Sequence, residues 1–185
     1  MNNKQLSTAY SELINRQLTE KGGDYLEIGI YNGVFISAMA DKHKSSRVFG
    51  IDPFIADGWT GEEQGTILMG PRNNFIENSK GLPVTFWEKT TKQCLDEKRY
   101  LELNNVTAIL IDGSHHFDDI MTDIRFVSLI QNKHECLVVF DDFHLVDVQR
   151  AFSEFRNFFS GRIKKEERVP TIAWFIIYPF PKQHI

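Results

Sequence analysis

Acidic and histidine side chains follow two apolar runs of this 185-residue sequence. The run "AILI" leads into D-G-S-H at residues 112–115, and the run "CLVVF" leads into Asp141 and Asp142. Carboxylates beside an imidazole can bind a divalent metal ion or transfer a proton near neutral pH. If both runs are strands of one parallel sheet, these side chains share the sheet edge where ligands bind in open α/β folds.

Other expected strands end in the same way. "LEIGIYNG" contains Glu27, Gly29 and Gly33, "GIDPF" contains Asp52, and "FWEKTT" contains E-K-T at residues 88–90. Like charges crowded at one sheet edge repel one another, so a cation should compensate them. The sequence therefore predicts a metal ion, a cationic ligand, or both at this edge.

The first of these loops discriminates between nucleotide ligands. A dinucleotide fold uses G-x-G-x-x-G, whereas this loop reads E-x-G-x-x-x-G, with Glu27 in place of the first glycine. A carboxylate disfavours a pyrophosphate and favours an ammonium or sulfonium group. Gly29 permits a tight turn beneath a ligand, and Gly33 lets the following helix pack closely. Asp52 lies about twenty residues after this loop, at the position where dinucleotide-binding folds have an acid that binds ribose hydroxyls.

These four residues predict a positively charged adenosine ligand without phosphates, which S-adenosylmethionine fits. One alternative stays open, because Glu27 is also compatible with a strand-end carboxylate that faces water.

Short apolar runs alternate with amphipathic stretches, which predicts βα units around a mostly parallel sheet. A leading helix is expected within residues 1–21, ended by Gly22 and Gly23. Strands are expected at 24–30, 47–52, 84–88, 106–112, 136–142, 162–169 and 172–180, and further helices at 33–43, around 75–76, at 117–127 and at 148–159. The last two strands follow each other without a helix, which favours an antiparallel pair.

Residues 54–72 have no clear period and contain four glycines and a tryptophan. This segment is too long for a plain connection, so it is either a lid over a functional site or a disordered surface insertion. No linker divides the chain, and we expect a single domain over residues 1–185.

The bulk composition excludes several classes of protein. A formal net charge of -4 argues against a broad basic face for nucleic acid and against a basic membrane-surface patch. Cys94 lies in a polar helical stretch and Cys136 begins an apolar strand. The two have neither metal-ligand spacing nor the number needed for a disulfide framework. The N-terminus lacks the apolar core of a signal peptide, and the longest apolar run, "IAWFIIY", is too short to span a bilayer. We expect a soluble, cytoplasmic protein.

Four segments carry a resemblance to a known family: "YLEIGIYNG", "GIDPF", "ILIDGSHHFDDIMTDI" and "VVFDDFHLVDVQRAFSEF". From about residue 22 to 160 the chain resembles the class I S-adenosylmethionine-dependent methyltransferases. Within them it is similar to the metal-dependent O-methyltransferases that include the macrocin and mycinamicin sugar enzymes. The resemblance implies a Rossmann-like, doubly wound, mostly parallel seven-stranded sheet with an antiparallel last strand and helices on both faces.

The resemblance also implies roles for individual residues. Asp112, Asp141 and Asp142 would hold Mg²⁺, a hard ion that prefers oxygen ligands and lowers the pKa of a bound substrate hydroxyl. His115 would be the general base, although Asp112 is an alternative acceptor for that proton. The implied reaction is Mg²⁺-assisted O-methylation of a hydroxyl on a small molecule or sugar, by an enzyme that could be a homo-oligomer.

The third strand end departs from the family pattern, which often has Gly-Asp-Ser there. Thr90 can still bind the adenine region of the cofactor, but Lys89 places a positive charge where an acid is common. Around the D-G-S-H segment, Ser114 or Asp118 could cap the helix that follows, and Asp118 and Asp119 suit the first turn of that helix. His116 could contact substrate or be simply exposed.

Two other functions remain open from the sequence. The same Asp/His cluster could activate water in a metal-dependent hydrolase, which would leave Glu27, Gly33 and Asp52 unexplained. A non-catalytic module that binds S-adenosylmethionine is the other alternative.

Overall fold

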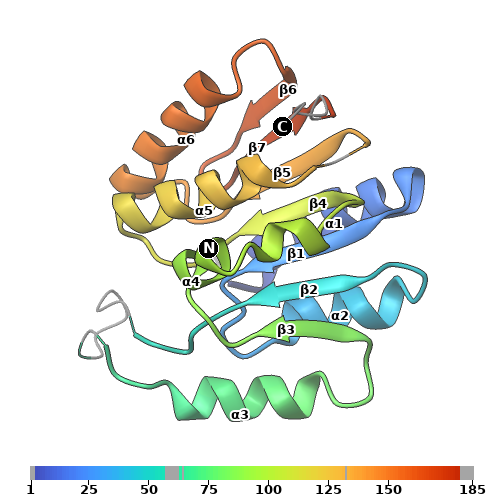
Figure 1. The fold of residues 1–185 in the computed structure, drawn as a ribbon, viewed down its shortest axis with the longest axis vertical. Helices are drawn as coiled ribbons and strands as arrows, with labels where there is room; N and C mark the ends of the chain where they lie inside the picture. The colour runs from blue at the N-terminus through green and yellow to red at the C-terminus, as the bar shows by residue number, and fades with distance from the viewer. Residues whose placement is uncertain (1–2, 57–62, 64, 132, 180–185) are drawn as a thin grey trace.

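The computed structural model describes residues 3–56, 63, 65–131 and 133–179 (Figure 1). The strands are β1 (Asp24–Ile28), β2 (Val48–Ile51), β3 (Val84–Trp87), β4 (Val106–Ile111), β5 (Cys136–Phe140), β6 (Ile163–Arg168) and β7 (Ala173–Ile177). The helices are α1 (Asn3–Lys21), α2 (Val34–Lys42), α3 (Met69–Asn78), α4 (Thr91–Asp96), α5 (Phe117–Leu129) and α6 (Val146–Phe158), with a 3-10 turn η1 (Arg99–Glu102).

The strands form one seven-stranded sheet in the order β3-β2-β1-β4-β5-β7-β6. All neighbours pair in parallel except β7, which is antiparallel to both β5 and β6. The predicted sheet, with its antiparallel last strand, is confirmed. The strand order reverses at β1, whose neighbours are β2 and β4, and this switch point is where ligands bind in doubly wound folds.

Alternate residues of the central strands supply two separate cores. Leu26 and Ile28 of β1 pack in the core beneath α4, α5 and α6, whereas Tyr25 packs in the core beneath α1, α2 and α3. In Figure 1, α4 and α5 lie in front of the sheet and α1 and α2 behind it. Because side chains alternate along a strand, Glu27 points to the same side as Tyr25, toward α1.

Between β3 and β4, the sequence indicates a polar helical stretch around Cys94, which is α4 in the structure, but it does not predict η1. The helix α4 has only six residues and a largely polar sequence, so it has no clear hydrophobic period. Its sequence signal is "TTKQ", a capping box in which Thr90 is the N-cap and Gln93 the third helical residue.

The predicted lid segment, residues 54–72, is divided by the structure. Its end belongs to α3, which begins at Met69, and Ile55 forms an isolated antiparallel bridge with Ile67. Residues 57–62 and 64 lie outside the described part of the chain, so the lid stays a prediction.

Across the described ranges, no helix combines the length and apolar character needed to cross a bilayer.

Candidate active site

A cavity of about 650 Å³ opens at the carboxyl ends of β1, β2 and β4. Six of the residues predicted from the sequence line it: Gly29, Asp52, Thr90, Asp112, His115 and Asp142. Ile28 and Ile51, which belong to the core beneath α4 and α5, line it as well. The cavity therefore lies on the α4–α5 side of the sheet edge.

Glu27 lies within β1, behind the cavity lining. Its side chain is 2% exposed and accepts a hydrogen bond of 2.7 Å from the Tyr25 hydroxyl, so the water-facing alternative is wrong. Burial raises the pKa of Glu27 to about 8, against the opposing effect of the Tyr25 hydrogen bond, and the charge of Asp52 adds to the rise. Glu27 is thus a buried acid that holds its proton at neutral pH unless a positive charge approaches.

Asp112 and Asp141 directly follow β4 and β5. Because side chains alternate along a strand, both point to the same side of the sheet as Glu27. Both backbone amides stay in the sheet ladder, since Asp112 donates to the Ile28 carbonyl at 2.8 Å and Asp141 donates to the Ile111 carbonyl at 3.1 Å. Burial, followed by the charges of Asp141 and Glu27, raises the pKa of Asp112 well above its usual range. We call Glu27, Asp112 and Asp141 the strand-end carboxylates.

The strand-end carboxylates face α1, where Tyr10 is half-buried. Burial, followed by the charges of Asp141 and Asp112, raises the pKa of the Tyr10 phenol. Sequence reasoning missed this residue, because nothing in the leading helix indicates which of its turns reaches the sheet edge.

Gly29 and Gly33 are required for steric reasons that involve other elements. Gly29 has φ +88°, and a Cβ there would lie 2.1 Å from the Asp112 carbonyl oxygen. Gly33 has φ +72°, and a Cβ there would lie 2.4 Å from Phe75 Cδ2 on α3. The predicted close packing at Gly33 is therefore made by α3.

Asp52 joins the two loops that border the cavity. Its carboxylate accepts backbone hydrogen bonds from Ile30 at 2.7 Å, Tyr31 at 2.8 Å and Phe54 at 2.5 Å. Tyr31 and Phe54 both have φ +50°, so this carboxylate stabilises two backbone conformations that non-glycine residues rarely adopt. A carboxylate has about four acceptor positions, and roughly one remains for a ribose hydroxyl.

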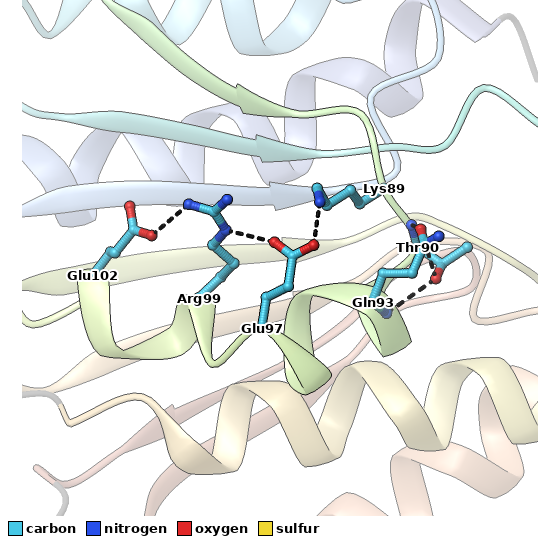
Figure 2. A network of polar contacts seen from close by, with 6 residues as sticks. All are labelled: Lys89, Thr90, Gln93, Glu97, Arg99 and Glu102. Carbon is cyan, nitrogen blue, oxygen red and sulfur yellow. Dashed lines mark hydrogen bonds and ion pairs between the residues drawn. The ribbon is translucent and has the colours of Figure 1, made fainter.

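The third strand end is tied into a polar network along α4 (Figure 2). The backbone N–H of Gln93 donates to Thr90 Oγ1 at 3.2 Å, and the backbone N–H of Thr90 donates to Gln93 Oε1 at 2.8 Å. Lys89 pairs with Glu97, which also pairs with Arg99 at 3.0 Å, so the Lys89 charge is compensated outside the cavity. Thr90 lines the cavity while capping α4, and its contact with adenine stays a prediction.

His115 and Asp142 form a pair at the cavity wall, with His115 Nε2 2.9 Å from Asp142 Oδ2. The hydrogen bond from His115 lowers the pKa of Asp142, and His144 Nδ1 lies 3.7 Å from the other carboxylate oxygen. Burial raises the pKa of the neighbouring Asp141 to about 6, although the Asp142 backbone amide donates to it at 2.8 Å. Asp142 has φ +50°, a left-handed conformation that sets its position against His115.

The metal prediction concerned Asp112, Asp141 and Asp142. Among the described residues, no three Asp, Glu, His or Cys side chains converge in an arrangement that could hold a metal ion. Asp142 is directed to His115 in this structure, so the three carboxylates do not fit a metal ion as they stand. The ligand roles stay predictions.

The start of α5 differs in detail from expectation. The N-cap is His116, without a side-chain cap, in place of Ser114 or Asp118. Asp118 and Asp119 occupy the first turn as predicted, but Asp119 also lines the cavity and accepts a 2.8 Å hydrogen bond from Ser114 Oγ. His116 is exposed.

In the part of the cavity that lies between α4 and α5, sequence reasoning predicted a ligand contact only for Thr90. We call this part the α4–α5 floor, and its residues all line the cavity: Thr90, Thr91, Lys92, Asp119, Thr122 and Asp123. Asp123 is 5% exposed, and burial raises its pKa to about 7. The available signal was an acid on the apolar stripe of α5, between Ile120 and Ile124.

No protein-family model matches the sequence, and no curated protein matches it. Solved structures do match. The O-methyltransferase NovP aligns with a TM-score of 0.67 and 14% identity, over 91% of this chain and 78% of NovP. The TDP-rhamnose 3'-O-methyltransferase CalS11 of calicheamicin biosynthesis aligns with a TM-score of 0.62 and 14% identity, over 95% of this chain and 81% of CalS11.

A ribosomal protein L11 methylase from Lactobacillus delbrueckii subsp. bulgaricus aligns with a TM-score of 0.56 and 16% identity, over 98% of this chain and 81% of the methylase. The chain has the fold of class I S-adenosylmethionine-dependent methyltransferases. Since these neighbours include two O-methyltransferases and a methylase named for a ribosomal protein, this methyltransferase fold by itself does not fix the acceptor.

Proposed function

We propose that this protein is an S-adenosylmethionine-dependent O-methyltransferase that acts on a hydroxyl of a small molecule or sugar. The observation that carries the proposal is the set of strand-end carboxylates beside the cavity. Burial and, for Asp112, mutual repulsion raise the pKa of all three. A sulfonium donor brings the positive charge that relieves this repulsion, whereas a phosphate-bearing ligand would increase it.

The chain's own residues orient the donor. Asp52, which still has an acceptor position, binds a ribose hydroxyl while it holds the Ile30–Tyr31 and Phe54 backbones. Gly29 lines the cavity, and because it has no side chain the end of β1 can lie close to the backbone that follows β4.

The proton of the acceptor hydroxyl goes to His115. When Nε2–H donates to Asp142, the basic lone pair of the imidazole is on Nδ1, and Asp142 stabilises the imidazolium that forms. In the reaction the acceptor oxygen forms a bond to the methyl carbon as the carbon–sulfur bond breaks, and the donor leaves as a neutral thioether. S-adenosylmethionine supplies the methyl group.

Two features of the proposal, the sugar acceptor and Mg²⁺, go beyond what the fold supports. An acceptor hydroxyl on a sugar is supported by the likeness to CalS11, at 14% identity. Assistance by Mg²⁺ is supported only by the family resemblance of the sequence, and no step above depends on it.

Calorimetric titration with S-adenosylmethionine and S-adenosylhomocysteine tests the donor site. We expect binding of both in the micromolar range and a loss of at least about 10-fold in Asp52→Asn, which weakens a charge-assisted hydrogen bond. Asp41→Asn, an exposed change on α2, is the matched control and should bind as wild type. Absence of binding at millimolar ligand would rule out the proposed function.

Methyl transfer is tested with a labelled donor and a panel of hydroxyl acceptors that includes sugar nucleotides. For any acceptor found, His115→Ala should lower kcat by about 10²- to 10⁴-fold, the usual contribution of a general base. Donor binding by His115→Ala should be unchanged. Unchanged turnover would remove the base role from His115, and full activity in chelator would remove Mg²⁺ from the proposal.

A further inference from the structure

Asp123 is a buried acid on the cavity wall that the proposed reaction does not use. It lies in α5, is 5% exposed and borders the cavity together with Thr91 of α4. Because α4 packs against α5, Asp123 and Thr91 meet at the bottom of the α4–α5 floor. A hydrogen bond with Thr91 stabilises the charged form of the carboxyl, against the effect of burial.

The carboxyl has no cationic partner within the described ranges. Lys92 also lines the cavity, but its ammonium group pairs with Asp96 at 3.1 Å. On the opposite side, an ideal Cβ on Gly113 would lie 3.6 Å from Asp123 Oδ2, so this oxygen faces a backbone without a side chain. Buried carboxyls that lack a cation need hydrogen-bond donors, and the cavity is where a donor can enter.

The order of the polar groups around the cavity indicates which part of a ligand reaches Asp123. In a nucleoside the 5' substituent and the base leave opposite ends of the ribose. With the sulfonium beside the strand-end carboxylates and the ribose hydroxyls at Asp52, the base extends toward the α4–α5 floor. Gly113 lines the cavity beside Asp123, so the wall there consists of backbone without a side chain.

We propose that Asp123 binds the exocyclic 6-amino group of a purine and so selects a 6-aminopurine nucleoside over a 6-oxopurine one. The inference rests on the proposed function. Above its pKa of about 7, Asp123 is a carboxylate that only accepts hydrogen bonds, and a 6-amino group donates them. A 6-oxo group places a second acceptor against Asp123 and leaves a buried carboxylate unpaired.

Titration with S-adenosylhomocysteine and its 6-oxo analogue S-inosylhomocysteine at about pH 8.5, where Asp123 is ionised, tests this inference. We expect wild type to prefer the 6-amino compound by at least about 10-fold. Asp123→Asn keeps the size of the side chain and adds an amide donor that can bind a 6-oxo group. The preference should therefore shrink by at least about 5-fold in Asp123→Asn, with less loss for the 6-oxo compound.

Asp118→Asn is the matched control, since Asp118 is an exposed carboxylate in the first turn of α5 and is not one of the residues that line the cavity. Its preference should equal that of wild type, and thermal melting should show that both variants are folded. Equal binding of the two compounds by wild type would overturn the inference without any variant. So would a wild-type preference in folded Asp123→Asn. If wild type binds neither compound, the inference falls together with the proposed donor site, whereas binding without discrimination removes the inference alone.

Discussion

The strand-end carboxylates, of which Asp112 lines the cavity, and the α4–α5 floor are two acidic regions that are built differently. Glu27, Asp112 and Asp141 come from three neighbouring parallel strands and point to the α1 side. Asp123 comes from a helix on the other face of the sheet and reaches the cavity because α5 packs against α4. Strand alternation alone sets the first region, whereas the second depends on how two helices pack.

The two regions also differ in what compensates their charge. Burial, followed by the charges of Asp141 and Glu27, raises the pKa of Asp112, so this region favours a full positive charge in the ligand. Asp123 is stabilised by Thr91 and repelled weakly by exposed Asp119, so one neutral donor group is enough for it. A single ligand with a cationic end and a donor-bearing end would satisfy both regions.

The largest expected difference between the regions is steric. Gly29→Ala places a methyl group 2.1 Å from the Asp112 carbonyl at φ +88°, so we expect a loss of at least about 3 kcal/mol in the free energy of unfolding. In Gly113→Ala the new Cβ meets Asp123 and Ile28 at 3.6 and 3.7 Å, which is ordinary contact, and stability should change by less than about 1 kcal/mol. Urea denaturation of both variants measures this, and a stable Gly29→Ala would contradict the packing of β1 against the end of β4.

The next difference concerns pH. The pKa of Glu27 is raised from 4.5 to about 8, so the folded state holds a proton that the unfolded state loses above about pH 5. Stability should therefore fall as pH rises from about 5 to 8, and Glu27→Gln should remove a part of that fall on the order of a few kcal/mol. The amide oxygen that this substitution introduces can still accept the Tyr25 hydroxyl, so the variant should fold.

Asp123→Asn provides the comparison, since the pKa of Asp123 is raised only to about 7. The loss of stability with rising pH that Asp123 causes should be complete near pH 7, about one pH unit below the point where the loss caused by Glu27 is complete. Denaturant midpoints measured from about pH 5 to 9 separate the two. Identical pH profiles for Glu27→Gln and wild type would show that Glu27 is ionised in the folded protein.

The smallest effect belongs to the cap of α4. Thr90→Ala removes the acceptor for the Gln93 amide and should cost about 1 kcal/mol of stability, whereas Thr90→Ser should cost less than half of that. Because Thr90 begins the helix that carries Thr91, the alanine variant should also loosen the α4–α5 floor. Hydrogen exchange should accelerate in α4 and remain unchanged in β1 and β4, and an equal increase in all three would contradict local capping.

Much of the fold followed from apolar runs and their flanking residues. "DYLEI", "VTAILI" and "CLVVF" are buried along their whole length, and such continuous runs are typical of central parallel strands. The bounds of the short helix α4 were not predicted, because six largely polar residues have no measurable period, although its capping box was present in "TTKQ".

The sequence by itself determined that carboxylates meet at one edge of the sheet, because parallel strands bring their carboxyl ends together whatever covers them. Tertiary structure decided what each of those groups does. It buried Glu27 against Tyr25, occupied three acceptor positions of Asp52 with backbone amides, and paired Asp142 with His115. It also brought Asp123 into the cavity through the packing of α5 on α4. These outcomes depend on distances between residues far apart in the chain, which local periodicity does not contain.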